Sequence, residues 1–470
     1  MPLSDQALGW MQHAQMQAQQ AEADARVDSA NRAVEYYEGN TEAETLGYFD
    51  RQLVNQIAFA NNNITQRIIK RISLVHKVKP NAIFPDDANE EAVKVYRQAT
   101  VMDGVKLPRA ERMLNLLKGI FLKSTFRNGR LELDIIRDFV PIFDGDPMQP
   151  VAVTYPVQAS SEVTSTEGEV WAFWSADEQF LYLKGGEVLE REDPLQGKNP
   201  YGMLPGIFCF AEGAPPEEAF MNFMPCMDII ETNLSINLAL TEMNANIRFQ
   251  NFDYLYLEGV KNAGDITISQ DAFTELPPGV KMGAVGISSH VADTITGVEF
   301  LYASIAQNYG LDAKFVQGVA PESGLALNIR NQELMENRAG TLENWRMIHR
   351  DLYKIRQAQV KYHFRKSLPD GMELDFHETE QVQTAQEKRE QAEWKVQNGW
   401  STYAQELLES NPDAFPGDPD NDITPLMQAE EHIRENLQKS AEFKQAGTPM
   451  TAGEQAIANA LNQQPQGELE

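Results

Sequence analysis

The stretch that most constrains the fold of this chain is residues 293–366, where two helical patterns are joined by a short loop. The first pattern places on one helical face the apolar residues Ile295, Val298, Leu301 or Tyr302, Ile305 and Tyr309. The second restarts after Pro321 and continues to Phe364. At ~1.5 Å per residue, a helix over residues 324–366 is on the order of 60 Å long, which exceeds the width of a small domain. A chain of 470 residues with such a helix folds either into two to four domains or into one elongated, multi-part subunit.

Charge separates this long helical pattern from the rest of the chain. The chain has 69 acidic and 40 basic residues, a formal net charge of −29. Residues 324–366 instead hold nine basic and four acidic residues, which by themselves suggest a helix that grips DNA. The global charge opposes that interpretation, because nucleic-acid binding needs a basic footprint. Composition therefore indicates a soluble acidic protein, or a surface that lies near DNA without holding it.

Cysteine content and hydropathy indicate a cytoplasmic protein. Cys209 and Cys226 have no CxxC or CxxH neighbours, so we expect buried free thiols, with one disulfide between them as the alternative. No apolar run reaches the ~18 residues of a membrane span. The N-terminus also lacks the basic and apolar segments of a secretion signal. We expect no membrane partner.

The first part of the chain combines expected helices with a basic face. Residues 1–35 are rich in Ala, Gln and Asp and have few large apolar groups, so we expect a peripheral helix or a partly disordered arm. Residues 61–80 predict an amphipathic helix with a solvated basic face, the alternative being a DNA site. Residues 88–127 predict two more helices, broken near 104–108.

Short alternating runs then predict a small antiparallel β-layer. These runs are rich in β-branched and aromatic residues and lie at 131–135, 151–155, 170–174 and 179–183, followed by a short apolar strand at 207–210. Trp171, Phe173, Trp174 and Tyr182 could form a stacking platform for bases. We expect them in core or inter-subunit packing instead, because no basic residues are interleaved with them.

A helix pair with a β-rich insertion follows this layer. Residues 225–249 predict a helix with an apolar stripe and with Asn and Thr on the opposite side. Strand patterns return at 254–257, 266–269 and 280–287, before the helix at 293–309. Two helices that carry a small β-rich cap at one end form a projection rather than a closed pocket.

The last hundred residues are strongly acidic. Residues 367–470 contain 21 acids and six bases, and helices are expected at 385–396 and 423–439. Residues 447–470 are rich in Gln, Ala, Gly and Pro, and we expect them to be disordered.

Sequence motifs of common enzyme and metal sites are missing. The chain has no GxxxxGK[ST], no GxGxxG after a strand, no HExxH and no GxSxG. Its seven histidines are scattered without carboxylates at ligand spacing, and His349 and His363 are expected to be surface or interface groups. We predict no catalytic, cofactor-binding or metal-binding residues, no cofactor and no enzymatic activity. A mechanical or scaffolding role is the expectation that remains.

The order of these elements resembles the portal proteins of tailed double-stranded DNA bacteriophages. The strongest match is QNYGLDAKFVQG at 307–318 followed by SGLAL at 323–327, which opens the long helix. NPYGMLP at 199–205 is similar to the family's portal turn. YYEG at 36–39, together with the basic helix after it, is similar to the family's N-terminal wing. The resemblance covers most of residues 35–440. Val319–Pro321 is an insert particular to this chain, and the β-layer at 131–210 does not align with the family.

The resemblance implies an α+β, mainly helical, elongated subunit of a head-to-tail connector ring. Its implied parts are an arm (1–35), a wing (36–224), stem helix 1 (225–250), a clip (251–292), stem helix 2 (293–310), a tunnel loop (311–323), a long tunnel or wing helix (324–366), an acidic helical crown (367–446) and a disordered tail (447–470). Such a ring, a homododecamer in most cases, occupies one vertex of the capsid in the virion after assembly in the host cytoplasm. Double-stranded DNA is packaged and later ejected through its channel without sequence-specific contacts.

The resemblance also implies roles for individual residues. DNA in the channel would pass closest to the residues Lys314, Phe315, Gln317 and Arg330. Acids of neighbouring subunits would meet the arginines Arg338, Arg346 and Arg350. The terminase large subunit and the head-completion or tail adaptor proteins would dock on the clip at Asp253, Tyr254, Lys261 and Asp265. The major capsid and scaffolding proteins would be further partners.

Two other functional classes stay open on the sequence. One is another ring-forming phage head–tail structural protein, such as an adaptor or a scaffold, although adaptors are shorter and lack the stem–clip–stem order. The other is an acidic enzyme with an unrecognised site, which convergent carboxylates or histidines in a pocket of the folded monomer would indicate.

Overall fold

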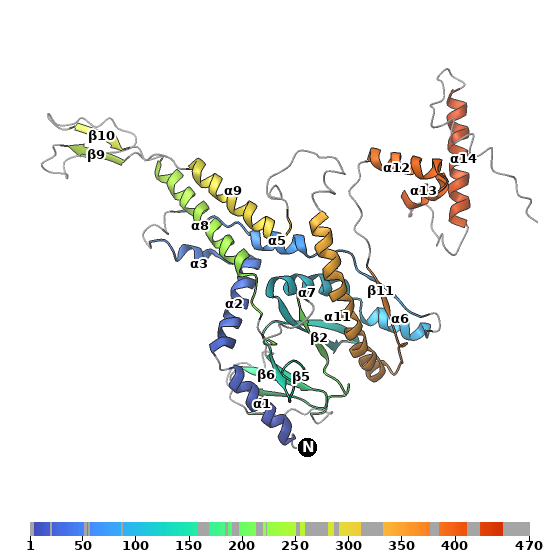
Figure 1. Ribbon diagram of the computed structural model, residues 1–470, viewed down its shortest axis with the longest axis horizontal. Coiled ribbons are helices and arrows are strands. Elements are labelled where there is room, and N and C mark those ends of the chain that lie inside the picture. Colours follow the sequence, from blue (N-terminus) through green and yellow to red (C-terminus); the bar gives the residue numbers. More distant parts are fainter. Residues whose placement is uncertain are drawn as a thin grey trace, which may run out of the picture. The chain divides into compact units, whose positions relative to one another are not determined.

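The structure is a computed structural model of the chain. The residues it describes are 4–18, 21–50, 54, 57–85, 88–157, 169–183, 187–189, 197–212, 220–221, 223–250, 254–258, 281–285, 291–311, 332–376, 385–410 and 424–444. They divide into two compact units, the first made of residues 1–319 and 331–379 and the second of residues 320–330 and 380–470 (Figure 1). The fold is mixed α and β, with more helix than strand.

In the described residues of the first unit, six helices precede the main strands. They are α1 (Asp5–Ala18), α2 (Ala21–Glu38), α3 (Glu42–Leu46), α5 (Ile64–Ile72), α6 (Glu90–Ala99) and α7 (Asp103–Leu117). Asn63 begins α5 and Asn89 begins α6, because each side chain accepts a hydrogen bond from a backbone N–H in the first turn. Lys118 ends α7 in the left-handed region, at a φ of 66°. The expected break near residues 104–108 lies a few residues earlier, between α6 and α7.

The N-terminal residues form the helices α1 and α2, and a helix is one of the two alternatives that their composition indicates. Ala7 and Met11 of α1 are buried against the four-stranded sheet described below. Ala33 and Tyr36 of α2 are buried in the main core. The few apolar side chains of this segment are sufficient to pack the two helices, because they lie on the helix faces that contact the rest of the unit.

The β-layer consists of two antiparallel sheets. The three-stranded sheet has the order β3-β2-β8, from β2 (Gly119–Arg127), β3 (Arg130–Ile136) and β8 (Gly206–Phe210). The four-stranded sheet has the order β4-β5-β6-β7, from β4 (Val140–Phe143), β5 (Pro150–Pro156), β6 (Val170–Ser175) and β7 (Gln179–Leu183). The four predicted alternating runs and the predicted strand at 207–210 are confirmed.

The second helix predicted in residues 88–127 ends earlier than expected, at Leu117, because residues 119–127 form strand β2. Its first six residues are all buried, so the strand shows no alternation of apolar and polar residues. The packing is close at its start, since a Cβ on Gly119 would lie 2.5 Å from the ring of Phe223. Trp171, Phe173 and Tyr182 on the four-stranded sheet are buried, as expected for packing residues.

The remaining elements of the first unit follow the expected order. They are α8 (Met227–Gln250), β9 (Tyr254–Glu258), β10 (Lys281–Val285), α9 (Val291–Asn308) and α11 (Gln332–Phe364). β9 and β10 pair antiparallel, with Tyr254 opposite Val285 and Glu258 opposite Lys281. The predicted strand at 266–269 lies outside the described residues. A separate two-stranded sheet joins β1 (Asn81–Ile83) to β11 (Glu373–Asp375).

The second unit is helical in its described residues. It contains α12 (Ala385–Gln397), α13 (Tyr403–Ser410) and α14 (Thr424–Lys444) around a small core of Ala404, Leu408 and Ala429. The two helices predicted at 385–396 and 423–439 are confirmed, whereas α13 was not predicted. None of the helices described in either unit is long and apolar enough to span a membrane.

Candidate functional site: the anchored helix pair and the long helix

The helix pair α8–α9 is held together by an apolar seam. Figure 1 shows the two helices side by side, and the chain leads from α8 into β9 and from β10 back into α9. Side chains of the main core contribute to this seam from both helices: Ile229, Ile230 and Leu234 from α8, and Val298, Tyr302 and Ile305 from α9. Ile230 and Leu234 in α8, and the three positions in α9, are three or four residues apart, so each helix buries one stripe. The pairing of the two helices is the arrangement that the sequence predicts.

A second strip of α8, next to the apolar one, is a polar ladder, which we define as Asn233, Asn237, Thr241 and Asn244. Its side chains bind the backbone of residues 58–65. Asn237 Oδ1 accepts from the N–H of Asn62 at 2.8 Å, and Thr241 Oγ1 accepts from the N–H of Ala60 at 3.2 Å. Asn233 accepts from the Thr65 N–H at 3.1 Å and donates to the Asn62 carbonyl at 2.9 Å. Asn244 donates to the carbonyl of Ala58 at 3.2 Å.

The sequence indicates a polar side of this helix, but not that the side is buried. The signal of the ladder residues was the spacing of three or four residues along α8, which aligns side chains on one side of a helix. An extended segment needs partners for its backbone groups when it is buried, and the ladder provides them. Asn233, Asn237 and Thr241 are themselves almost fully buried.

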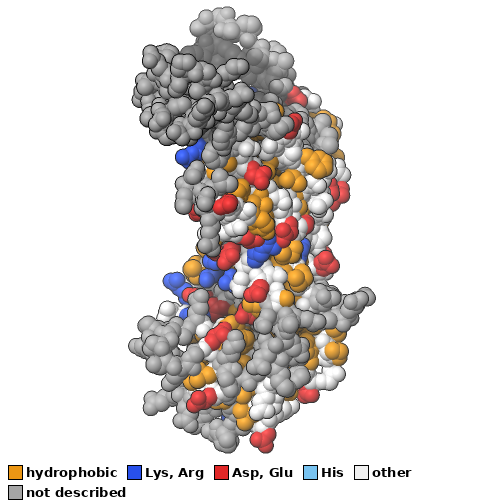
Figure 2. Space-filling model, turned by 90° about the vertical axis from the view of Figure 1, so that its left-hand side faces the viewer, with side chains coloured by type: hydrophobic (Ala, Val, Ile, Leu, Met, Phe, Trp, Pro, Cys, Tyr) orange, Lys and Arg blue, Asp and Glu red, His pale blue; other side chains and the backbone are white. Residues whose placement is uncertain are grey.

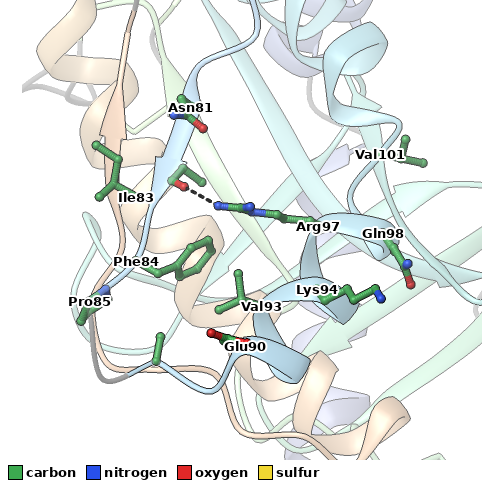
Figure 3. Close-up of a pocket in the computed structure, with 12 residues that line it drawn as sticks. Asn81, Ile83, Phe84, Pro85, Glu90, Val93, Lys94, Arg97, Gln98 and Val101 are labelled. Atoms are coloured by element: carbon green, nitrogen blue, oxygen red, sulfur yellow. Dashed lines mark hydrogen bonds between the residues drawn. The ribbon is translucent and has the colours of Figure 1, made fainter. Parts of the chain in front are cut away.

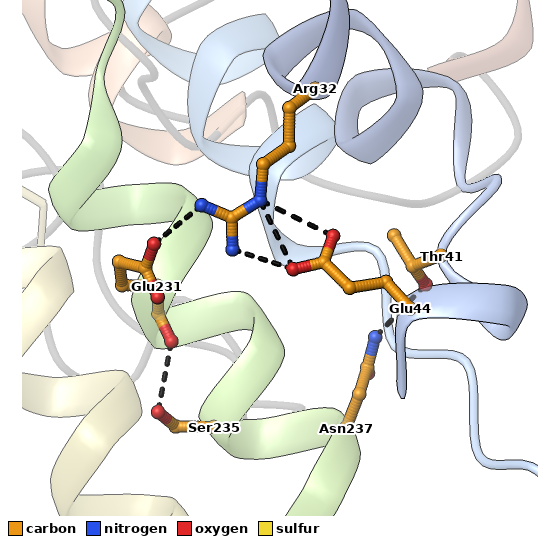
Figure 4. Close-up of polar contacts among 6 residues, drawn as sticks. All are labelled: Arg32, Thr41, Glu44, Glu231, Ser235 and Asn237. Carbon is orange, nitrogen blue, oxygen red and sulfur yellow. Dashed lines mark hydrogen bonds and ion pairs between the residues drawn. The ribbon is translucent and has the colours of Figure 1, made fainter. Parts of the chain in front are cut away.

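A charged clamp fixes the start of α8 to α2 and α3 (Figure 4). Arg32 of α2 donates to both carboxylate oxygens of Glu44 in α3, with a shortest distance of 2.7 Å, and to Glu231 of α8 at 2.5 Å. Burial disfavours the charged guanidinium, but these hydrogen bonds and charges outweigh it and raise the pKa of Arg32. Beside the clamp, Asn237 donates to Thr41 at 3.2 Å.

The end of α9 is tied to the start of α8. The hydroxyl of Tyr309 donates to the carboxylate of Asp228, with distances of 2.9 and 3.0 Å to its two oxygens. Burial, and then the neighbouring Cys226 and Asp228, raise the pKa of Tyr309, so the hydroxyl stays protonated as the donor. Cys226 and Cys209 are both buried free thiols, as the sequence predicts. The base of the helix pair is thus bound at three places, namely the clamp, the ladder and this contact.

The long helix α11 is anchored inside the subunit along much of its length. Arg356 is 1% exposed and forms a bidentate ion pair with Asp103 of α7, at 2.6 and 2.7 Å. Gln359 exchanges hydrogen bonds with Ser124 of β2 at 2.6 and 2.8 Å. Lys354 pairs with Asp351 and Lys366 with Glu91. Several cations of this segment therefore meet acids of their own subunit. The expected contacts of Arg338, Arg346 and Arg350 with neighbouring subunits stay predictions.

Two histidines that seemed scattered in the sequence meet in the core. His349 of α11 is buried, and its Nε2 lies 2.9 Å from the Nε2 of His76. His76 Nδ1 lies 3.1 Å from the carboxylate of Glu111, which also accepts from the backbone N–H groups of Val75 and His76 at 2.8 Å each. Trp345 packs edge-on against His76. The expectation that His349 is a surface group is wrong, because partners distant in sequence make its burial possible.

The predicted site residues are only partly within the described structure. Those outside it are Lys314, Phe315, Gln317, Arg330, Asp253, Lys261 and Asp265. Tyr254 begins strand β9. Arg338 lies 3.5 Å from the carbonyl of Leu74, Arg346 pairs with Glu343 on the same helix, and Arg350 is exposed. Among the described residues, no group of three or more His, Cys, Asp or Glu side chains could hold a metal ion.

The outer surface of the helix pair carries apolar side chains. Phe300 of α9 is 69% exposed, and Ile295 of α9 and Ile247 of α8 are exposed as well. Gly297 lies between the two α9 residues, and a Cβ added there would meet no atom within 4 Å. Ile295 and Phe300 are five residues apart, about 140° around the helix, so they are separate exposed side chains and do not form one stripe.

Comparisons with known proteins identify no family. No family profile matches the chain, and no curated protein sequence matches it. Among the solved structures, a chain from the virion of a native gene transfer agent particle is similar, with a TM-score of 0.33 and 10% sequence identity over 77% of this chain and 90% of that chain. We draw no argument from a similarity of this degree.

Proposed function

We propose that this chain is the subunit of a portal-type ring, through which double-stranded DNA enters and leaves the capsid of a tailed bacteriophage. The observation that carries the proposal is the order of elements in the first unit. A paired helix α8, an antiparallel β9–β10 insertion, the returning helix α9 and then the long helix α11 follow one another in the chain. This order coincides with the motifs at 199–205, 307–318 and 323–327 that resemble portal proteins.

The anchoring of the helix pair supports a mechanical role. A channel wall must keep its position while DNA moves past it, and the Arg32 clamp, the polar ladder and the Tyr309–Asp228 contact hold the base of α8–α9. The net charge of −29 also suits a channel, because each neutralised phosphate would add affinity and slow the DNA. Figure 2 shows acidic side chains spread over one face of the molecule, with fewer basic ones among them.

The proposal assigns roles to segments beyond the described residues. Residues 311–323 form the tunnel loop, where Lys314 makes a weak, replaceable contact with DNA. Residues 251–292 form the clip, which docks the terminase large subunit and later the adaptor proteins. The exposed apolar side chains of α8 and α9 face neighbouring copies in the ring, since a ring needs two different, complementary surfaces on each subunit.

Negative-stain microscopy of the purified chain tests this proposal. We expect rings with a central hole wide enough for duplex DNA. A stable monomer under all salt conditions would contradict the proposal. In a packaging assay, Lys314→Ala should leave the rings intact and change DNA packaging or retention. Loss of the rings in this variant would show that Lys314 belongs to a subunit interface and not to the channel.

A further inference from the structure

We propose that a groove between β1 and α6 docks an extended acidic segment of a partner protein. This β1–α6 groove is a cavity of about 730 Å³ (Figure 3). It is lined on one side by residues 81–85 and 88, and on the other by Glu90, Val93, Lys94, Arg97, Gln98 and Val101. The proposal does not depend on the formation of a ring, since every residue that lines the groove belongs to one chain.

One wall of the groove is the edge of a strand. Among the described strands, β1 pairs with β11 alone. The carbonyl of Ala82 is directed away from β11, because it accepts a hydrogen bond from Arg97 of α6 at 3.4 Å. In an antiparallel pair the N–H and C=O of one residue point to the same side, so the N–H of Ala82 also faces the groove. An extended segment can add to such an edge through backbone hydrogen bonds.

The rim and floor of the groove are apolar. Ile83 is 50% exposed and Val101 is 52% exposed at the rim, while Phe84 and Val93 are half-buried below them. The apolar surface continues past Val101 to Val105, which is 66% exposed. Val78 is exposed as well. Four of the exposed large apolar residues of the described chain thus lie between residues 78 and 105. Exposed apolar side chains gathered in this way indicate a binding surface.

Charge decides the kind of segment that fits. Figure 3 shows Arg97 reaching across the groove from α6 toward β1, with Lys94 about one turn earlier on the helix and extending away from β1. The guanidinium lies over the ring of Phe84, at 5.8 Å from its centroid, and its bond to Ala82 uses one of five N–H donors. Glu90 is the acid in the lining. In a chain of net charge −29, a groove with Lys94 and Arg97 is a place where carboxylates of a partner are favoured.

The same features favour a protein over duplex DNA. DNA binding requires a row of cations that matches the phosphates, and the contribution of apolar side chains is small. The β1–α6 groove instead combines a strand edge, apolar side chains at its rim and two cations in its lining. An acidic segment with alternating apolar side chains satisfies all three.

A peptide-binding experiment on the full chain tests the proposal. The probe is a fluorescent synthetic peptide that alternates glutamate and valine, and fluorescence anisotropy reports its binding. We expect Lys94→Glu to weaken binding about tenfold and Gln98→Lys to strengthen it about threefold, which are changes typical of exposed charges at an interface. A gain from Gln98→Lys cannot result from misfolding. Lys70→Glu, which changes an exposed lysine on α5 outside the groove, should leave binding unchanged.

Peptide and DNA controls determine the outcome. A peptide that alternates lysine and valine should not bind, and a short DNA duplex should not displace the acidic peptide. The proposal is overturned if the acidic peptide fails to bind, if Lys94→Glu and Lys70→Glu have equal effects, or if duplex DNA displaces the peptide.

Discussion

The cluster of His76, Glu111 and His349 shows how much a buried polar residue depends on its neighbours. Glu111 accepts two backbone hydrogen bonds and contacts His76, which in turn contacts His349. Burial, followed by the charges of His76 and Arg356, holds the pKa of His349 well below its ordinary value. In the folded protein, His349 is therefore still neutral at the pH at which an exposed histidine begins to bind a proton.

This neutrality predicts a loss of stability in acid. Because its pKa is lower in the folded state, His349 takes up a proton more readily when the chain unfolds, so unfolding is favoured as pH falls below about 6.5. One such group contributes up to about 1.4 kcal/mol per pH unit. His349→Gln keeps a hydrogen-bonding side chain without a titrating ring. We expect this variant to lose less stability than the unsubstituted chain as the pH falls. Urea unfolding at a series of pH values between neutral and mildly acidic measures the loss.

The matched control is His432→Gln, at an exposed position on α14 in the second unit. It should leave the acid dependence of the first unit's unfolding transition as it is in the unsubstituted chain. An unchanged acid dependence in His349→Gln would mean that other groups cause it.

Among the secondary-structure elements, α8 combines two different kinds of contact. Its apolar stripe packs on α9, and its polar ladder binds the backbone of residues 58–65. Apolar packing tolerates small displacements along a helix, whereas hydrogen bonds to successive backbone groups specify one register. The ladder therefore fixes the position of α8 relative to the segment before α5, and the Arg32 clamp fixes it relative to α2 and α3.

Asn237→Ala tests the contribution of the ladder. The substitution removes the acceptor for the Asn62 N–H and the donor to Thr41, and it leaves these groups without their partner. We expect a decrease of about 1–3 kcal/mol in the free energy of unfolding. Asn246→Ala, at an exposed position of the same helix, should change it by less than about 0.5 kcal/mol. Equal effects of the two substitutions would rule out a stabilising role for the ladder.

For the molecule as a whole, the exposed apolar side chains and the acidic charge have separate consequences. High net charge keeps separate chains apart in solution unless specific surfaces attract them. In the proposed ring, the exposed apolar side chains of the helix pair, Phe300 foremost, would provide such a contact. Assembly should therefore depend on these side chains, and it should be favoured by salt, which screens the repulsion between acidic subunits.

Phe300→Glu tests this dependence. Because the side chain is 69% exposed, the substitution should leave the fold of the subunit intact, while a charge at the contact should prevent assembly. Sedimentation velocity measures the assembly and circular dichroism the fold. Trp400→Glu, at an exposed aromatic residue in the second unit, is the control and should still assemble. Normal assembly of Phe300→Glu would place the subunit contact elsewhere.

Local patterns predict the fold well where one face of an element is apolar and the other is polar. The helices α8, α9 and α14 and the strands β3, β5, β6 and β7 were predicted close to their observed positions. The helix expected at 61–80 is shorter, since α5 ends at Ile72. Strand β2 was mistaken for helix because its first six residues are all buried, so that no alternation marks it. The loop of residues 311–323 and most of 251–292, where the predicted DNA and clip contacts lie, are outside the described residues, and those roles remain predictions.

The sequence was sufficient for the order of helices and strands and for the pairing of α8 with α9, because periodic apolar residues are a local signal. It was not sufficient for the Arg32 clamp, the polar ladder, the Arg356–Asp103 ion pair or the buried histidines. Each of these joins residues far apart in the chain, as His76 and His349 show with 273 positions between them. A charged or polar side chain is buried only where a partner meets it, and the packing of distant segments determines whether that partner is present.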